Sequence, residues 1–145
     1  MLTFAKVKLQ AWKDLAADNT WMCMDSTCED GGGDNRMSIT VNLRYTGKEG
    51  SARKFAEEMV SSGTAAAIRN ESGNIRYEYY ESLDDPETIL LIDSWDSQEA
   101  IDVHHASPMM QKIMELREKY DLHMTVERFV SDDTMPDSDK SFIRE

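Results

Sequence analysis

The 145-residue chain has few cysteines and prolines, an excess of acidic residues, and no long hydrophobic run. Its two cysteines are too few for a disulfide framework. The formal net charge of −12 argues against nucleic acid or an anionic membrane as a partner, because a polyanion would be repelled. No window is long and apolar enough to span a bilayer or to form a signal peptide. We therefore expect a cytoplasmic protein.

The length of the chain predicts one domain with an additional segment at each end. Residues 1–36 are predicted to form an N-terminal extension, an amphipathic helix followed by a Gly-rich linker. Within it, Cys23 and Cys28 have no histidine nearby, so we expect two reduced thiols and no metal site. Residues 37–130 are predicted to form the domain, and residues 131–145 an acidic tail that is mostly solvated.

Alternating apolar and polar residues predict four strands in the domain, over residues 38–45, 75–81, 88–95 and 122–130. Apolar residues at helical spacing predict one helix over residues 51–70 and another over 109–120, preceded by a short helical corner. The resulting order, βαββαβ, predicts a ferredoxin-like α+β fold. Such a fold has a four-stranded antiparallel sheet with two helices on one face.

Several of these strands carry apolar or aromatic residues on both faces, although helices would cover only one face. The other face would then be a larger apolar patch than monomers normally expose. We therefore expect a homodimer in which the two sheets pack face to face.

The richest stretch for chemistry is residues 90–110. Its apolar strand is interrupted by Asp93, just before the large aromatic Trp95. Asp96 is predicted to cap the helical turn that follows, and His104 falls near the end of that turn. An acid, an aromatic ring and a titratable imidazole are thus brought near one corner of the fold.

Residues 37–130 resemble the antibiotic-biosynthesis monooxygenase family of dimeric α+β barrels. The residues that carry the resemblance are Gly73 with Tyr77, Asp93-Ser-Trp95, Ser97 with Glu99-Ala100, His104, and Ser107-Pro108. The resemblance implies a dimer, and members of the family oxygenate quinols and polyphenols with neither metal nor flavin. Other members degrade haem, isomerise small signalling sugars or have no known activity, since a fold does not fix a function.

Two positions depart from the family's pattern. Asp93 stands where the family usually has Glu, and Met109 stands where some relatives have a second histidine. The haem-degrading branch uses an Asn on the first strand with a Trp and a His on the second helix. Asn42 is close to the first of these positions, but His104 and Met114 occupy the other two. Haem binding or degradation is therefore the less favoured alternative.

Oxygenation without a cofactor requires the phenol or quinol to react as its anion, so the site must supply a base and exclude water. His104 is the expected base, with Asp93 behind it to raise its basicity. The alternative is that His104 satisfies a helix end or a neighbouring carboxylate, and that Asp93 pairs with an arginine. The expected substrate-binding residues are Asn42, Arg44, Tyr77, Tyr79 and Trp95. The structural alternative is that Asn42 and Arg44 are ordinary polar strand residues and that Trp95 fills the core where a helix meets the sheet.

These observations predict a cofactor-independent monooxygenase, without a metal, that acts on a small quinol- or polyphenol-type aromatic substrate and O2. No P-loop, dinucleotide fingerprint, nucleophile elbow or zinc helix motif is present in the sequence, in keeping with a cofactor-free site. The alternative is a non-catalytic or stress-related module of the same fold that binds a small molecule, with Phe, Met and Tyr side chains filling the pocket.

Overall fold

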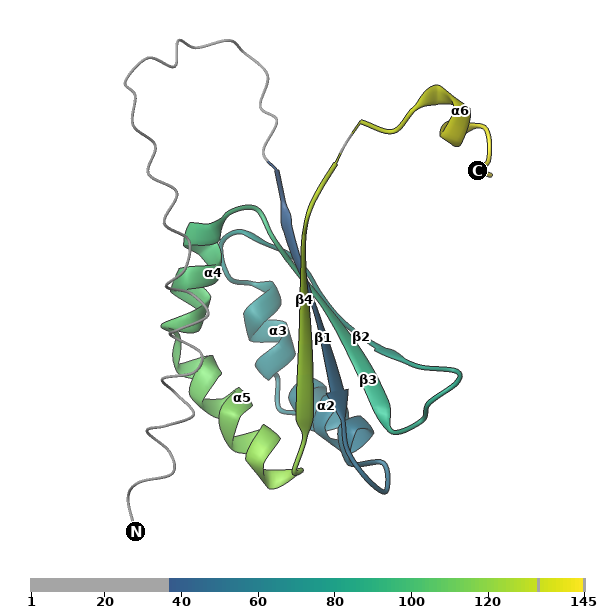
Figure 1. Cartoon of the computed structure of the whole chain (residues 1–145). Helices are drawn as coiled ribbons and strands as arrows, with labels where there is room; N and C mark the ends of the chain where they lie inside the picture. The colour runs from purple at the N-terminus through teal and green to yellow at the C-terminus, as the bar shows by residue number, and fades with distance from the viewer. Residues whose placement is uncertain (1–36, 133, 145) are drawn as a thin grey trace. The chain divides into compact units, whose positions relative to one another are not determined.

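The computed structural model describes residues 37–132 and 134–144 (Figure 1). The helix and linker predicted for residues 1–36, with Cys23 and Cys28, lie outside these residues.

The described residues form one antiparallel sheet with helices on one face (Figure 1). In chain order the elements are β1 (Ile39–Thr46), α2 (Ser51–Ser61), α3 (Thr64–Arg69), β2 (Asn74–Glu81), β3 (Thr88–Trp95), α4 (Gln98–His105), α5 (Pro108–Lys119), β4 (His123–Val130) and α6 (Asp137–Lys140). The strand order is β2-β3-β1-β4, so β2 and β4 are the two edges. The ferredoxin-like α+β prediction is confirmed. None of the helices in the described residues is both long enough and apolar enough to cross a membrane.

The first predicted helix is broken in two. The prediction of a single helix over residues 51–70 is wrong at Gly63, which has φ +79° and separates α2 from α3. A residue in the left-handed region cannot continue an α-helix, and glycine adopts that region without steric cost. The apolar periodicity continues across the break, so the pattern alone did not reveal it.

The hydrophobic core lies between the helices and the facing side of β1 and β3. The register pairs Ile39 with Trp95 and Tyr45 with Ile89, and all four side chains are buried. Phe55 of α2 packs against Tyr45 with ring centroids 4.9 Å apart. Alternation along each strand then places the intervening residues on the face that none of the described helices covers, which we call the open face.

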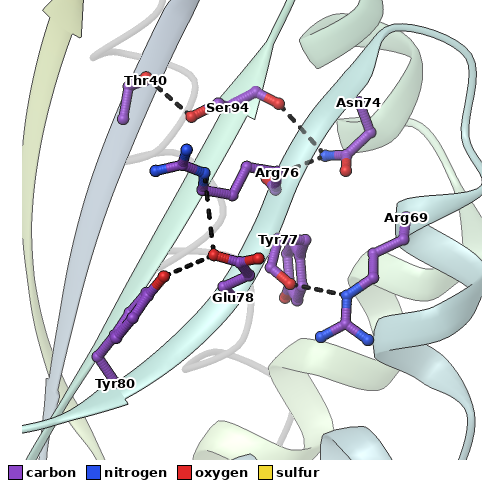
Figure 2. Close-up of polar contacts among 8 residues, drawn as sticks. All are labelled: Thr40, Arg69, Asn74, Arg76, Tyr77, Glu78, Tyr80 and Ser94. Atoms are coloured by element: carbon purple, nitrogen blue, oxygen red, sulfur yellow. Dashed lines mark hydrogen bonds and ion pairs between the residues drawn. The ribbon is translucent and has the colours of Figure 1, made fainter. Parts of the chain in front are cut away.

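The open face carries its own polar contacts, which Figure 2 shows on β1, β2 and β3. The hydroxyls of Thr40 and Ser94 are 2.8 Å apart, and on β2 the Tyr80 hydroxyl donates to Glu78 at 2.5 Å. Ile75 was expected to share a face with Tyr77, but it lies at a β-bulge between Asn74 and Arg76 and is 58% exposed. The extra residue of a bulge shifts the alternation, so Ile75 leaves the core side.

Candidate functional site

The corner after β3 is built by local hydrogen bonds. Ser97 caps α4, because its Oγ accepts a hydrogen bond from the backbone N–H of Ala100 at 3.3 Å. The prediction that Asp96 is the cap is wrong; its carboxylate accepts from the Ser97 hydroxyl at 2.7 Å. The backbone N–H of Asp96 donates to the carbonyl of Gly73 at 2.9 Å. The loop before β2 is thereby held against the start of α4.

Trp95 and His104 stack inside this corner. Their ring centroids are 4.9 Å apart with 33° between the planes, and the exposed fractions of the two residues are only 1% and 4%. Trp95 thus has the burial of a core plug, and His104 packs against it. His105, the next residue, is exposed, as expected.

The partner of His104 is Glu71. The Nδ1 atom of His104 is 2.6 Å from the Oε2 atom of Glu71, which lies in the loop between α3 and β2. Glu71 therefore has the role that was predicted for Asp93, and no sequence pattern had indicated Glu71. The structure agrees with the alternative prediction that His104 pairs with a neighbouring carboxylate. If Nδ1 carries the proton, the carboxylate fixes that tautomer and leaves Nε2 as the basic nitrogen.

Asp93 lies on the same side of the sheet as Trp95 but pairs with an amide. Its Oδ1 atom accepts a hydrogen bond from Nδ2 of Asn74 at 3.3 Å, and the residue is 8% exposed. Burial raises the pKa of Asp93 to about 7, against the opposing effect of hydrogen bonds from Trp95 and Asn74, and the charge of Glu71 raises it further. Asp93 therefore changes protonation close to neutral pH, and neither His104 nor an arginine is the partner that it was expected to have.

Two tyrosines continue the buried polar group along β2. Tyr77 is paired with Asp93 in the sheet register, and its hydroxyl is 3.3 Å from that of Tyr79. Their rings meet edge to face at 5.7 Å. Burial raises the pKa of both hydroxyls, so both stay protonated near neutral pH and act as neutral hydrogen-bonding groups.

Asn42 and Arg44 lie on the open face and do not join the other predicted site residues. The register pairs Asn42 with Ile92 and Arg44 with Leu90, which alternate with the buried residues of β3. Among the described residues, the Oδ1 atom of Asn42 is buried without a hydrogen-bond partner, and Nη2 of Arg44 lies 3.7 Å from Oε2 of Glu127. Of the seven predicted site residues, five therefore share the helix-covered side.

A surface cleft of about 350 Å³ lies at the β2 edge of the sheet, away from most of these residues. Its lining comes from α2, β2 and β3: Arg53, Ala56, Glu57, Val60, Ser61, Tyr79, Tyr80, Glu81 and Ile89. Tyr79 is the one predicted site residue in that lining. Within the described part of the chain, no group of three or more His, Cys, Asp or Glu side chains could hold a metal ion.

The chain matches a known protein family. A family model described as "Antibiotic biosynthesis monooxygenase" matches residues 38–116, more than half of the chain. The matched residues run from the start of β1 into α5 and include the whole corner with Glu71, Asp93 and His104. Among proteins with curated descriptions, none matches the chain.

Solved structures share the fold at low sequence identity. SnoaB, a cofactor-independent oxygenase from Streptomyces nogalater, is 20% identical with a TM-score of 0.57, over 70% of this chain and 99% of SnoaB. A protein from Pseudomonas aeruginosa is 18% identical with a TM-score of 0.59, over 69% of this chain and 99% of its own. A protein from Shewanella oneidensis is 24% identical with a TM-score of 0.57, over 67% and 93%. At these identities the likeness establishes the fold alone.

Proposed function

The chain belongs to the antibiotic biosynthesis monooxygenase family, and on that premise we propose that it oxygenates a small quinol- or polyphenol-type substrate without a metal or flavin. Its similarity to SnoaB, a cofactor-independent oxygenase, supports the cofactor-free part of this proposal. The observation that carries the proposal is the pairing of a buried imidazole with a carboxylate at the corner, His104 with Glu71.

The proposed reaction begins with proton transfer from the substrate to Nε2 of His104. Glu71 holds Nδ1 and stabilises the imidazolium that forms, so it is a positioning residue for the base. The substrate anion then gives electrons to O2. One oxygen atom enters the substrate as a carbonyl at the carbon whose C–H bond is oxidised, and the other leaves as water. That water takes the proton that His104 returns and the hydrogen of the oxidised C–H bond, and the substrate supplies the electrons. Tyr77 and Tyr79, both neutral, would orient polar groups on the substrate through hydrogen bonds.

Oxygen uptake by metal-free protein tests this proposal. With a panel of anthrones and hydroquinones, we expect uptake by the wild type, a loss of about 100-fold or more in His104→Ala, and incorporation of one ¹⁸O atom from ¹⁸O2. Glu71→Gln should lower kcat and move its pH profile, because a neutral amide replaces the carboxylate that holds Nδ1 of His104. His105→Ala is the control, since it removes the adjacent imidazole and keeps the His104–Glu71 pair. Absence of uptake across the panel, or full activity in His104→Ala, would contradict the proposal.

One observation favours a second candidate function, a non-catalytic small-molecule-binding module. Asp93, Trp95 and His104 are each less than a tenth exposed, and none of them lines the cleft at the β2 edge. A substrate would reach His104 only after the covering side chains moved. Saturable binding of a phenol without oxygen uptake, unchanged in His104→Ala, would establish this second function and remove the first.

We also propose that the protein is a homodimer that joins through the open faces of its sheets. Leu90 and Ile92 lie on the open face and are only partly buried, and Tyr80 and Phe129 there are 44% and 51% exposed. No group in the described part of the chain donates a hydrogen bond to the buried Oδ1 of Asn42, and a second copy packed on this face would supply the donor.

A further inference from the structure

The outer edge of β2 carries backbone groups that no strand of the described residues pairs with. β2 joins the sheet through β3 alone, and in an antiparallel pair the N–H and C=O of every second residue point away from the partner strand. The carbonyl of Gly73 accepts a hydrogen bond from the N–H of Asp96, so this pair of residues faces inward. Tyr77 pairs with the residue three positions before Asp96 on β3, and its backbone groups therefore point outward. The same alternation turns the backbone groups of Tyr79 and Glu81 outward.

Arg69 covers one end of this outward set. Its Nε atom, at the end of α3, donates to the carbonyl of Tyr77 at 2.8 Å (Figure 2). A side chain that occupies the backbone of an edge strand is one way in which a protein protects such an edge. Within the described residues, no side chain makes a corresponding hydrogen bond to the backbone of Tyr79 or Glu81. The unprotected part of the edge therefore runs from Tyr79 to Glu81.

The cleft at the β2 edge lies directly beside this unprotected part, and Tyr79 and Glu81 belong to its lining. The facing wall is a stripe of α2 that includes Ala56 and Val60, and Ile89 of β3 also contributes. The volume of about 350 Å³ has room for the side chains of a bound segment. Extended peptides bind at an edge strand next to a groove by adding a strand to the sheet. Main-chain hydrogen bonds then supply affinity, and the groove selects side chains.

The polar rim of the cleft carries an excess negative charge. Arg53 lies 3.0 Å from Glu57 and 3.1 Å from Glu81, so one guanidinium faces two carboxylates and one negative charge stays uncompensated. Such a rim attracts a basic segment and repels an acidic one. The chain's own tail, residues 131–145, is acidic and therefore does not suit the rim.

We propose that the cleft at the β2 edge binds an extended basic segment of a partner protein, which adds a strand to the sheet. The backbone of the segment forms hydrogen bonds with the outward N–H and C=O groups of Tyr79 and Glu81. An apolar side chain of the segment packs against Val60 and Ile89, and a lysine or arginine lies beside Glu57 and Glu81. The site is separate from the corner after β3, and it does not depend on the proposed oxygenase activity.

A synthetic peptide, acetyl-Lys-Val-Lys-Val-Lys-Val-Lys-amide, tests the site in an NMR titration of the full chain. We expect the wild type to bind this peptide. The same peptide with glutamate in place of every lysine should not bind, because the rim repels it. A peptide with prolines at two consecutive central positions should not bind either, because it lacks a backbone donor on each edge of the strand.

A double variant tests the charge of the rim. Glu57→Gln combined with Glu81→Gln leaves Arg53 as the one charged group of the three, so the local net charge changes from one negative to one positive. We expect this variant to bind the basic peptide about tenfold more weakly or worse. The matched control is Glu115→Gln combined with Glu127→Gln, which removes two exposed carboxylates from α5 and from β4, the opposite edge of the sheet. The control variant should bind like the wild type.

Hydrogen exchange of backbone amides separates strand addition from a purely ionic contact. Saturation with the basic peptide should slow exchange at the N–H groups of Tyr79 and Glu81, because both become hydrogen-bonded, and should leave the amides of β4 unchanged. Unchanged exchange at Tyr79 and Glu81 would overturn the proposal.

The other outcomes of the titration are equally decisive. Equal affinity for the basic and acidic peptides, full affinity in the Glu57 and Glu81 double variant, or no binding by the wild type at about 1 mM peptide would each overturn the proposal. If a second copy of the chain occupies the edge instead, the amides of Tyr79 and Glu81 will exchange slowly without peptide and the peptide will not bind. None of these measurements involves oxygen uptake, so this test and that of the proposed function fail independently.

Discussion

At the scale of single residues, Asp93 shows how burial changes an ordinary side chain. An unperturbed aspartate has a pKa of about 3.9, whereas burial raises the pKa of Asp93 to about 7. Between these values the unfolded chain is ionised at this position while the folded chain keeps the proton. The contribution of Asp93 to stability therefore falls as pH rises from about 4 to about 7, and it stays at its lower value above that range.

We predict that Asp93→Asn removes this dependence, because an amide does not ionise and is nearly the same size. In urea titrations, the free energy of unfolding of the variant should increase relative to that of the wild type by roughly 1.4 kcal/mol per pH unit between pH 4 and 7. Although His105 is exposed, partial desolvation of its imidazole, with the neighbouring His104, lowers the pKa of His105, and this contribution to stability rises with pH over part of the same range. The difference between the two proteins, not either curve alone, is thus the informative quantity. Parallel curves for Asp93→Asn and wild type would contradict the prediction, and the exposed Asp84→Asn is the control.

His104 and Asp93 also show the limit of reasoning from motif spacing. The spacing from Trp95 correctly brought the imidazole to the tryptophan, since both lie on consecutive elements. It did not identify Glu71, because the contact between Glu71 and His104 spans 33 residues and depends on how the loop before β2 folds back. The signal that could have found it is the Glu71-Ser-Gly-Asn74 turn, whose glycine allows the chain to approach α4 closely.

At the scale of elements, two glycines set the path of the chain on either side of that loop. Gly63 has φ +79°, and a Cβ there would meet nothing within 4 Å. Gly73 has φ +87°, and a Cβ there would lie 2.5 Å from the Cβ of Ala100 and 2.6 Å from Oδ1 of Asp96. Both positions need the left-handed region, but only Gly73 also permits close contact between the loop and α4.

We predict that Gly73→Ala costs about 3 kcal/mol of unfolding free energy, whereas Gly63→Ala costs about 1 kcal/mol. The second variant carries the backbone cost alone, and the first adds the displacement of Asp96 and Ala100. The urea concentration at the midpoint of unfolding, compared at a constant m-value, measures both free-energy costs. Because the loop also carries Glu71, Gly73→Ala should in addition shift the NMR resonances of the His104 imidazole, and Gly63→Ala should not. Equal costs for the two variants would show that the close approach at Gly73 contributes nothing.

At the scale of the whole molecule, the proposed dimer predicts that the centre of the open face is buried between the two sheets. Ile92 is only partly buried and lies between Asn42 of β1 and Glu78 of β2 in the register. A lysine there is compatible with Glu78 in the monomer but would bury a charge between two packed sheets.

We therefore expect the wild type to sediment as a dimer at about 10 µM and Ile92→Lys to sediment as a monomer with unchanged secondary structure. Leu83→Lys is the control, because Leu83 is fully exposed in the turn between β2 and β3. A monomeric wild type at this concentration would contradict face-to-face packing of the sheets.

The sequence by itself determined the order of the strands and helices in the domain. Alternation over residues 88–95 and helical spacing over residues 109–120 are local patterns, and each follows from which side of an element is apolar. The predicted domain boundaries, with an extension over residues 1–36 and a tail from residue 131, stay predictions.

Only the tertiary structure decided which chemical groups meet. It paired His104 with Glu71 and Asp93 with Asn74, and it separated Asn42 and Arg44 from both by the thickness of the sheet. These outcomes depend on the register between strands and on loops that join distant parts of the chain. Periodicity shows that a residue belongs to a face, but contacts across the fold are fixed only when the elements pack.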